Sequence, residues 1–109
     1  MASRNILIFT AKAHEELDDI LFYIEHELCN PKASKDLLIE FINKTDFIKV
    51  FPESHPIVEN DFYNYKDIRK VNIGNYSMFY RYDSDAKEII ILTIIYTKRN
   101  IDNLIQLLQ

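Results

Sequence analysis

The sequence is poor in the residues that break or cross-link a chain. It has one glycine, three prolines and one cysteine among its 109 residues. So little glycine and proline, beside 48% hydrophobic residues, excludes a disordered linker and predicts a single ordered domain over residues 1–109. Cys29 has no second cysteine for an internal disulfide, which agrees with a reducing compartment.

Three further absences narrow the class of protein. No apolar run approaches the ~20 residues of a membrane-spanning helix, and the N-terminus lacks a signal-peptide pattern, so we expect a cytoplasmic protein without a membrane partner. The three histidines and the cysteine do not stand at metal-ligand spacings, and we expect no metal and no other cofactor. Basic residues are not in excess, because thirteen Lys and Arg face seventeen Asp and Glu. Any binding of nucleic acid would therefore rest on a local patch.

The most informative stretch that is present is the apolar run of residues 89–94, with four isoleucines and a leucine. These residues occupy both parities of the two-residue strand period, so they predict a strand inside a sheet, buried on both faces. Tyr96, Lys98 and Arg99 follow the run. They place cationic groups at one rim of the sheet, where we look for function.

Two amphipathic helices are predicted before this strand. Thr10 can cap a helix over residues 11–28, and a second helix begins at Asn30-Pro31 and ends before Phe51-Pro52. Apolar residues fall at helical spacings in both helices, namely Ala13, Leu17, Ile20, Leu21, Ile24 and Leu28, then Leu37, Leu38, Phe41, Ile42, Thr45 and Ile48. Four acids of the first helix are expected to form a solvated face: Glu15, Glu16, Asp18 and Asp19. The two helices should form an antiparallel hairpin on the sheet.

Short strands and a long loop complete the predicted domain. Residues 4–9 suit a first strand, and residues 53–64 suit a loop long enough to suggest a functional role. Gly74-Asn75 supplies a turn between strands at residues 68–73 and 76–82, and Asn100 can cap a last helix. The order β-α-α-β-β-β-α predicts an α+β fold with a helix hairpin packed on a small, mainly antiparallel sheet.

Several motifs in this order resemble the RelE/ParE superfamily, the toxins of type II toxin–antitoxin systems that are often called plasmid stabilisation proteins. The resemblance spans almost the whole chain. It rests on Ala13-x-x-x-Leu17-x-x-Ile20-x-x-Tyr23-Ile24, Asn30-Pro31-x-Ala33, Phe51-Pro52-Glu53, Ile68-Arg69-Lys70, Asn75-Tyr76-x-x-Phe79-Tyr80-Arg81-Tyr82-Asp83, and Ile94-Ile95-Tyr96-x-x-Arg99-Asn100.

The resemblance implies a small toxin that inhibits growth and is held inactive by a cognate antitoxin, usually the product of a neighbouring gene. One branch of the superfamily is implied to cleave mRNA on the translating ribosome, and another to poison DNA gyrase without being a nuclease. A toxin-like interaction module that has lost activity is a third alternative. The helix hairpin and an exposed sheet edge are the surfaces expected to bind the antitoxin. The sequence leaves open whether the chain forms a homodimer.

A metal-independent ribonuclease needs a base, an acid and cations around the phosphate. By resemblance, Glu53 stands near a catalytic glutamate, Arg69 and Lys70 can bind phosphate, Arg99 can stabilise charge, and Tyr96 can stack on a base or donate a proton. Further candidates for contact with nucleic acid are Lys70, Arg81 and Lys98.

Each of these residues also has a structural interpretation. Glu53 can solvate its loop, Tyr96 can cover the last helix, and Arg69 and Arg81 can form ion pairs with Asp67, Asp83 or Glu88.

Two departures from the nuclease pattern weigh against RNA cleavage. Asn72 stands where one nuclease subgroup has a catalytic arginine, and no histidine follows the last strand. The usual proton shuttle near pH 7 is therefore missing. The sequence favours a ParE-like, gyrase-directed or otherwise non-nucleolytic toxin, with the RelE-like endoribonuclease as the alternative.

Overall fold

A computed structural model describes residues 5–59 and 64–97 of the chain. The elements, in order, are β1 (Ile6–Phe9), α1 (Ala11–Phe22), a π-helical turn η1 (Tyr23–Glu27), α2 (Pro31–Val50), β2 (Arg69–Ile73), β3 (Tyr76–Asp83) and β4 (Glu88–Tyr96). The α+β fold and the predicted order from the first strand to the third meander strand are confirmed. The last predicted helix, from Asn100 on, lies outside the described residues.

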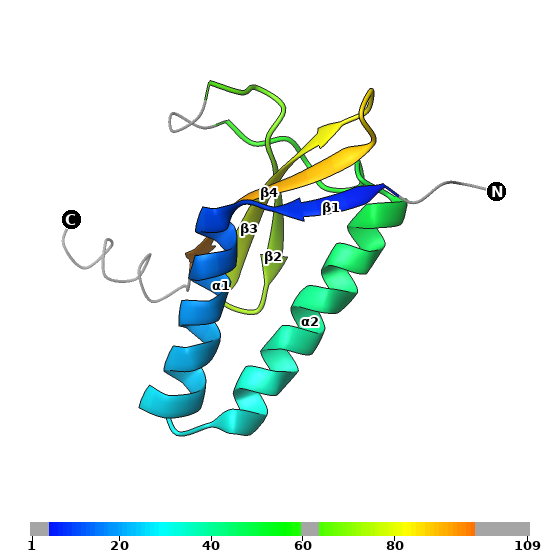
Figure 1. Ribbon diagram of the computed structural model, residues 1–109. Coiled ribbons are helices and arrows are strands. Elements are labelled where there is room, and N and C mark those ends of the chain that lie inside the picture. Colours follow the sequence, from blue (N-terminus) through cyan, green and yellow to red (C-terminus); the bar gives the residue numbers. More distant parts are fainter. Residues whose placement is uncertain (1–4, 60–63, 98–109) are drawn as a thin grey trace.

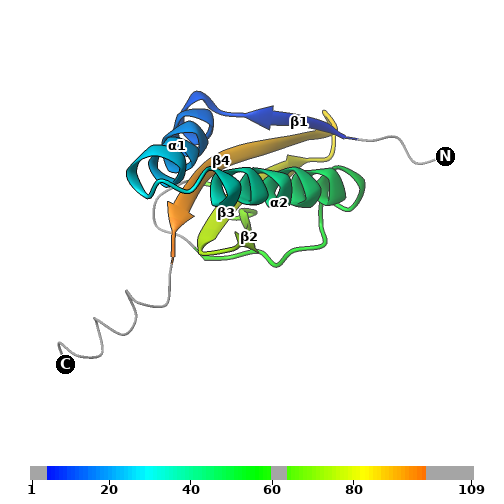
Figure 2. The same cartoon turned by 90° about the horizontal axis from the view of Figure 1, so that it is seen from below.

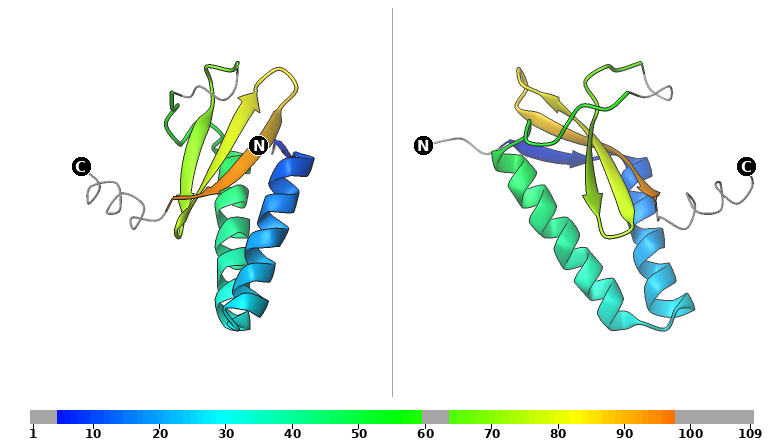
Figure 3. Two further views of the ribbon diagram at one scale, coloured as in Figure 1. Left: turned by 90° about the vertical axis from the view of Figure 1, so that its left-hand side faces the viewer. Right: turned by 180° about the vertical axis from the view of Figure 1, so that it is seen from behind.

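The four strands form one mixed sheet in the order β1-β4-β3-β2. β4 lies inside this sheet, parallel to β1 on one side and antiparallel to β3 on the other. α1 and α2 pack side by side on one face of the sheet (Figures 1 and 3). Figure 2 shows β1 at the border of the sheet, next to β4. The predicted interior position of the apolar strand is confirmed.

Burial of β4 on both faces, however, is wrong for part of the strand. Ile89 and Ile91 are fully buried beneath the helices, whereas Ile90 is only partly buried. The helices cover only one face of the sheet, so side chains of the other parity are less protected. A bulge interrupts the register with β3 near Leu92, which is buried.

The helix termini follow the capping chemistry of the sequence. Thr10 Oγ1 accepts a hydrogen bond from the N–H of Ala13, and Asn30 Oδ1 accepts one from the N–H of Ala33, each at 3.1 Å. Ser34 Oγ donates to the carbonyl of Leu21 at 3.0 Å and ties the two helices together near their connection. The predicted single helix over residues 11–28 instead changes after Phe22 into η1.

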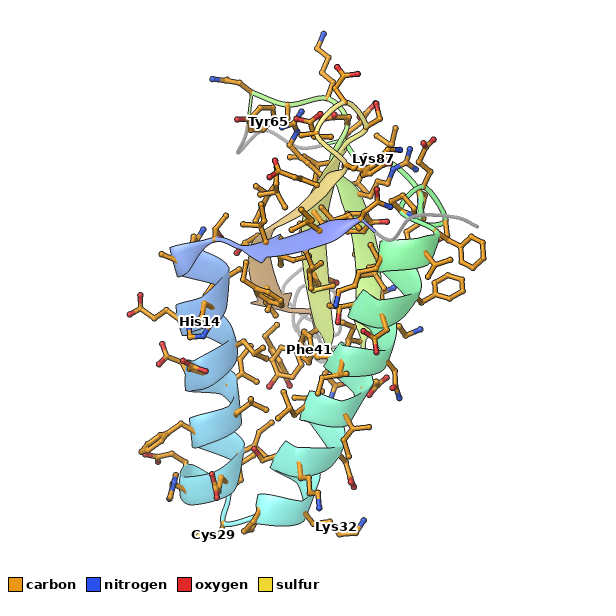
Figure 4. All side chains as sticks on the ribbon, turned by 45° about the vertical axis from the view of Figure 1, so that its right-hand side comes forward. His14, Cys29, Lys32, Phe41, Tyr65 and Lys87 are labelled. Atoms are coloured by element: carbon orange, nitrogen blue, oxygen red, sulfur yellow. The ribbon has the colours of Figure 1, made fainter. Side chains whose placement is uncertain are left out.

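α2 buries a narrower stripe than its sequence predicts. Phe41 and Ile48 are almost completely buried, and Phe41 points inward from α2 (Figure 4). Leu38 and Ile42 were expected in the same stripe but are 38% and 48% exposed. The sheet contacts only one side of α2, and these two residues lie on the flank that faces away from the sheet.

Glu16 does not belong to the solvated face that the sequence predicts. β4 continues beyond the end of β1, and α1 lies along the strand edge that β1 leaves open. Glu16 Oε1 accepts hydrogen bonds from Thr93 Oγ1 at 2.7 Å and from the N–H of Ile94 at 3.2 Å. Thr10 Oγ1 donates to the carbonyl of Leu92 at 3.2 Å. Side chains of α1 and of its N-cap residue Thr10 therefore form hydrogen bonds with the edge of β4 where a neighbouring strand is lacking.

Replacing Glu16 with alanine should lower the free energy of unfolding by about 1–3 kcal/mol, because the Ile94 N–H and the Thr93 hydroxyl lose their acceptor. Urea unfolding followed by circular dichroism measures this loss. Glu15→Ala is the matched control, since Glu15 is exposed on the same helix. Equal stability of the two variants would show that the hydrogen bonds of Glu16 to the edge of β4 do not stabilise the fold.

The predicted loop after α2 is partly attached to the sheet. The N–H of Val58 donates to the carbonyl of Ile68 at 2.8 Å, and the N–H of Lys70 donates to the carbonyl of Pro56 at 3.3 Å. Ile57 forms an isolated antiparallel bridge with Arg69. This segment therefore lies along the outer edge of β2 and covers it.

Candidate functional site

Arg69 holds the loop that carries Glu53. Its guanidinium donates to the carbonyl of His55 at 2.6 Å and to the carbonyl of Glu53 at 3.3 Å. The Glu53 carboxylate lies 3.9 Å from Nη2 of Arg69. The side chain of Arg69 is only 16% exposed, whereas that of Glu53 is 70% exposed. The predicted base and one predicted phosphate ligand are thus neighbours, but the arginine is engaged by backbone carbonyls and the carboxylate faces solvent.

Arg81 is also engaged within the fold. It donates to the two carboxylate oxygens of Asp67 at 2.9 and 3.1 Å, and its guanidinium carbon lies 3.9 Å from the ring centroid of Tyr65. The hydrogen bond from Arg81 lowers the pKa of Asp67, and the same contact raises the pKa of Arg81. A phosphate would have to compete with this paired, stacked arrangement.

The remaining described candidates lie elsewhere on the sheet. Arg69 pairs with Tyr80 and Tyr96 pairs with Tyr76 across the ladders. Tyr76 and Tyr80 are four residues apart on β3, which corresponds to about 13 Å. Lys70 follows Arg69 on β2 and therefore lies on the opposite face of the sheet.

The predicted nuclease residues are thus not brought together as one set. Glu53 and Arg69 are neighbours, and Tyr96 lies at the other end of the sheet. Arg69 pairs with Tyr80, so Lys70 and Arg81, the next residue on each strand, lie on the opposite face. Lys98 and Arg99 lie outside the described residues. The assignment of these residues to a nuclease or nucleic-acid site stays a prediction.

His55 is a residue near Glu53 that sequence reasoning did not assign to this site. Its ring lies edge-on to Tyr80 and to Phe47, with centroids 6.4 Å apart in both pairs. Burial lowers the pKa of His55, and the charges of Lys44 and Arg69 lower it further. The fold of the loop brings His55 to β2 and β3, and no local spacing in the sequence signals that return.

Tyr80 anchors the same loop from the core side. Its side chain is completely buried and its hydroxyl donates to the carbonyl of Pro52 at 2.8 Å. Together, Tyr80 and Arg69 therefore fix residues 52–55 by donating to three backbone carbonyls of this segment. These hydrogen bonds position the loop, and the polar groups of Arg69 and Tyr80 have their partners within the protein.

Two further observations concern the described residues alone. Within residues 5–59 and 64–97, no three His, Cys, Asp or Glu side chains are grouped so that they could hold a metal ion. The helices of this part of the chain are too short or too polar to cross a membrane.

The fold is similar to that of several solved chains from toxin–antitoxin systems. It resembles a chain of the chromosomal ParDE system of P. aeruginosa, with a TM-score of 0.68, 19% identity, and coverage of 87% of this chain and 98% of that one. It also resembles a chain of the RelBE2 toxin–antitoxin complex of Mycobacterium tuberculosis (TM-score 0.60, 16% identity, 86% and 99% covered). A chain of the RelE–RelB complex of Pyrococcus horikoshii is similar to the same degree (TM-score 0.60, 17% identity, 89% and 99% covered).

The sequence narrows this class to one family. A family model, the ParE toxin of the type II toxin–antitoxin system parDE, matches residues 7–101. The chain therefore belongs to the ParE toxin family, the toxin components of type II toxin–antitoxin systems. No curated protein matches the sequence significantly. The predicted membership in the RelE/ParE superfamily is confirmed.

Proposed function

We propose that this chain inhibits growth without cleaving RNA, by acting on DNA gyrase, and that the antitoxin encoded beside it neutralises it. Membership in the ParE toxin family supports the assignment as a toxin and the presence of an antitoxin partner. The non-nucleolytic mode is supported by one structural observation: the two described arginines of the predicted site are engaged by the protein itself, Arg69 by backbone carbonyls and Arg81 by Asp67.

This observation matters because phosphoryl transfer on RNA requires free cations. Charge grows on the phosphate in the transition state, and preorganised donors must point at it. Arg69 points its donors at His55 and Glu53, and Arg81 points its donors at Asp67. Turning either guanidinium toward a substrate would leave a partly buried acceptor without its donor, the carbonyl of His55 or the carboxylate of Asp67.

One arrangement favours the alternative, a RelE-like endoribonuclease that acts on the ribosome. Glu53 and Arg69 line the same small cavity of about 200 Å³, together with Asp67, Tyr82 and Ser84. A carboxylate beside an arginine is a plausible base and cation pair. The test below therefore includes Glu53.

Expression of the toxin without its antitoxin separates these functions. We expect growth arrest, accumulation of gyrase–DNA cleavage complexes on plasmid DNA, and intact transcripts on translating ribosomes. Glu53→Gln removes the candidate base while it preserves shape, and it should change the arrest by less than about twofold, because the side chain is solvent-exposed.

Other outcomes would contradict the proposal in distinct ways. Transcripts cut at codons, with a yield that falls about 100-fold or more in Glu53→Gln, would establish the nuclease instead. Unaffected growth in cells that contain folded toxin would favour an interaction module without toxicity. Circular dichroism of the purified variant confirms that it is folded.

A further inference from the structure

A groove lies at the end of the molecule remote from Glu53. It has a volume of about 850 Å³ and lies between the end of α1, the start of α2, the β2–β3 turn and the end of β4. Figure 1 shows this turn near the space between the two helices. Six of its lining residues carry the argument: Asp19, Tyr23, Leu28, Leu37, Tyr76 and Tyr96.

Three tyrosines from three different elements meet in this groove. The rings of Tyr76 and Tyr96 lie edge-to-face with centroids 5.3 Å apart. Tyr23 comes from η1 and lines the same groove. Burial raises the pKa of the Tyr76 hydroxyl, and the neighbouring phenols of Tyr96 and Tyr23 raise it further. Tyr23 and Tyr96 are both about half exposed, so their rings are accessible to a partner.

The described lining of the groove carries negative charge. Of the described residues that line it, Asp19 alone is charged, and neither lysine nor arginine is among them. No ion pair within the described residues engages the Asp19 carboxylate. Glu40 approaches the groove beside Gly74. A phosphate or another anion would be repelled here, whereas a cation would be attracted both by the carboxylate and by the faces of the tyrosine rings.

We propose that this groove receives a basic side chain, preferentially arginine, that is carried by an apolar segment of the antitoxin. This inference rests on the proposed function, which supplies the antitoxin as partner. The apolar antitoxin residues on either side of this basic residue would contact Leu28 and Leu37, which line the groove. Arginine fits better than lysine, because its planar guanidinium stacks on aromatic rings and donates two parallel hydrogen bonds to a carboxylate.

The test compares two charge reversals that are one residue apart. The purified toxin is titrated with the antitoxin encoded beside it, and the Kd is measured by calorimetry at low and at physiological salt. Asp19→Lys should raise the Kd about tenfold or more, since it replaces attraction with repulsion in the groove. Asp18→Lys changes the net charge equally but lies outside the groove, and it should change the Kd less than about threefold.

Two further variants separate the roles of the groove residues. Tyr96→Ala should also raise the Kd about tenfold, because a ring that faces the bound cation is lost. Asp19→Glu should keep most of the affinity that Asp19→Lys loses, because it keeps the negative charge. The salt dependence of the Kd should be weaker in Asp19→Asn than in the original protein.

Three outcomes would overturn the inference. Equal Kd values for Asp19→Lys and Asp18→Lys would show that the antitoxin binds elsewhere, while the proposed toxin function would stand. Self-association of the free toxin that is lost in Asp19→Lys, measured by sedimentation, would show that a second copy occupies the groove. Absence of any antitoxin binding by the original protein would contradict the proposed function itself.

Discussion

Replacing Phe41 with alanine is expected to lower the free energy of unfolding by about 3–5 kcal/mol, the range typical of a buried phenylalanine. Phe41 is 2% exposed and belongs to the cluster that joins α2 to the sheet, with Ile48, Met78 and Ile91 among its members. Removing the ring leaves a cavity between helix and sheet that rigid neighbours cannot fill. Single domains have a total free energy of unfolding of about 5–15 kcal/mol, so this loss is a large fraction of the total. Urea unfolding at about 25 °C, followed by circular dichroism, measures it.

Ile42→Ala is the matched control for this prediction. Ile42 follows Phe41 directly and is 48% exposed, so its truncation should cost less than about 1 kcal/mol. A loss of similar size in both variants would mean that α2 buries a wider face than its contacts with the sheet indicate. If Phe41→Ala does not fold, Phe41→Leu keeps the test quantitative, because it removes less volume and should cost about 1–2 kcal/mol.

Local chemistry explains why much of the fold was predictable. Caps at Thr10 and Asn30, the turn at Gly74 and the interior strand β4 all depend on residues close together in the sequence, and each is where the sequence predicts it. Gly74 has a φ of +57°, a conformation that glycine adopts without strain.

Long-range contacts account for the predictions that failed. The apolar spacing of α2 places Phe41 and Ile42 in one stripe, yet only the sheet decides which flank of that stripe is covered. In the sequence, Glu16 cannot be told apart from its solvated neighbours. Its role depends on the open edge of β4, which exists because β1 ends before β4 does.

The same limit applies to the candidate site. Arg69, Arg81 and Glu53 were selected by residue type and position, and the possible pairing of Arg81 with Asp67 was foreseen among several partners. The attachment of Arg69 to the carbonyls of Glu53 and His55 could not be foreseen, because backbone acceptors leave no signal in the sequence. The groove of Tyr23, Tyr76 and Tyr96 was likewise hidden, because it draws on three separate elements.

Alkaline pH is expected to destabilise the fold through Tyr80. Burial raises the pKa of this hydroxyl to about 12, and the nearby charge of Arg69 offsets only part of that effect. In the unfolded chain the hydroxyl titrates near ~10. The stabilising contribution is therefore complete below about pH 10 and is lost as the pH rises toward about 12, because the unfolded chain releases a proton that the folded chain retains. The loss should reach about 2–3 kcal/mol at the end of this interval.

Tyr80→Phe tests this origin of the alkaline sensitivity. The variant keeps the buried ring but cannot ionise, so its free energy of unfolding should fall less steeply between about pH 10 and 12 than that of the original protein. Below about pH 9 the variant should be less stable by about 0.5–1.5 kcal/mol, because the carbonyl of Pro52 loses its donor. The two stability curves should therefore approach each other, or cross, as the pH rises. Parallel curves over the whole range would show that Tyr80 does not control the alkaline transition.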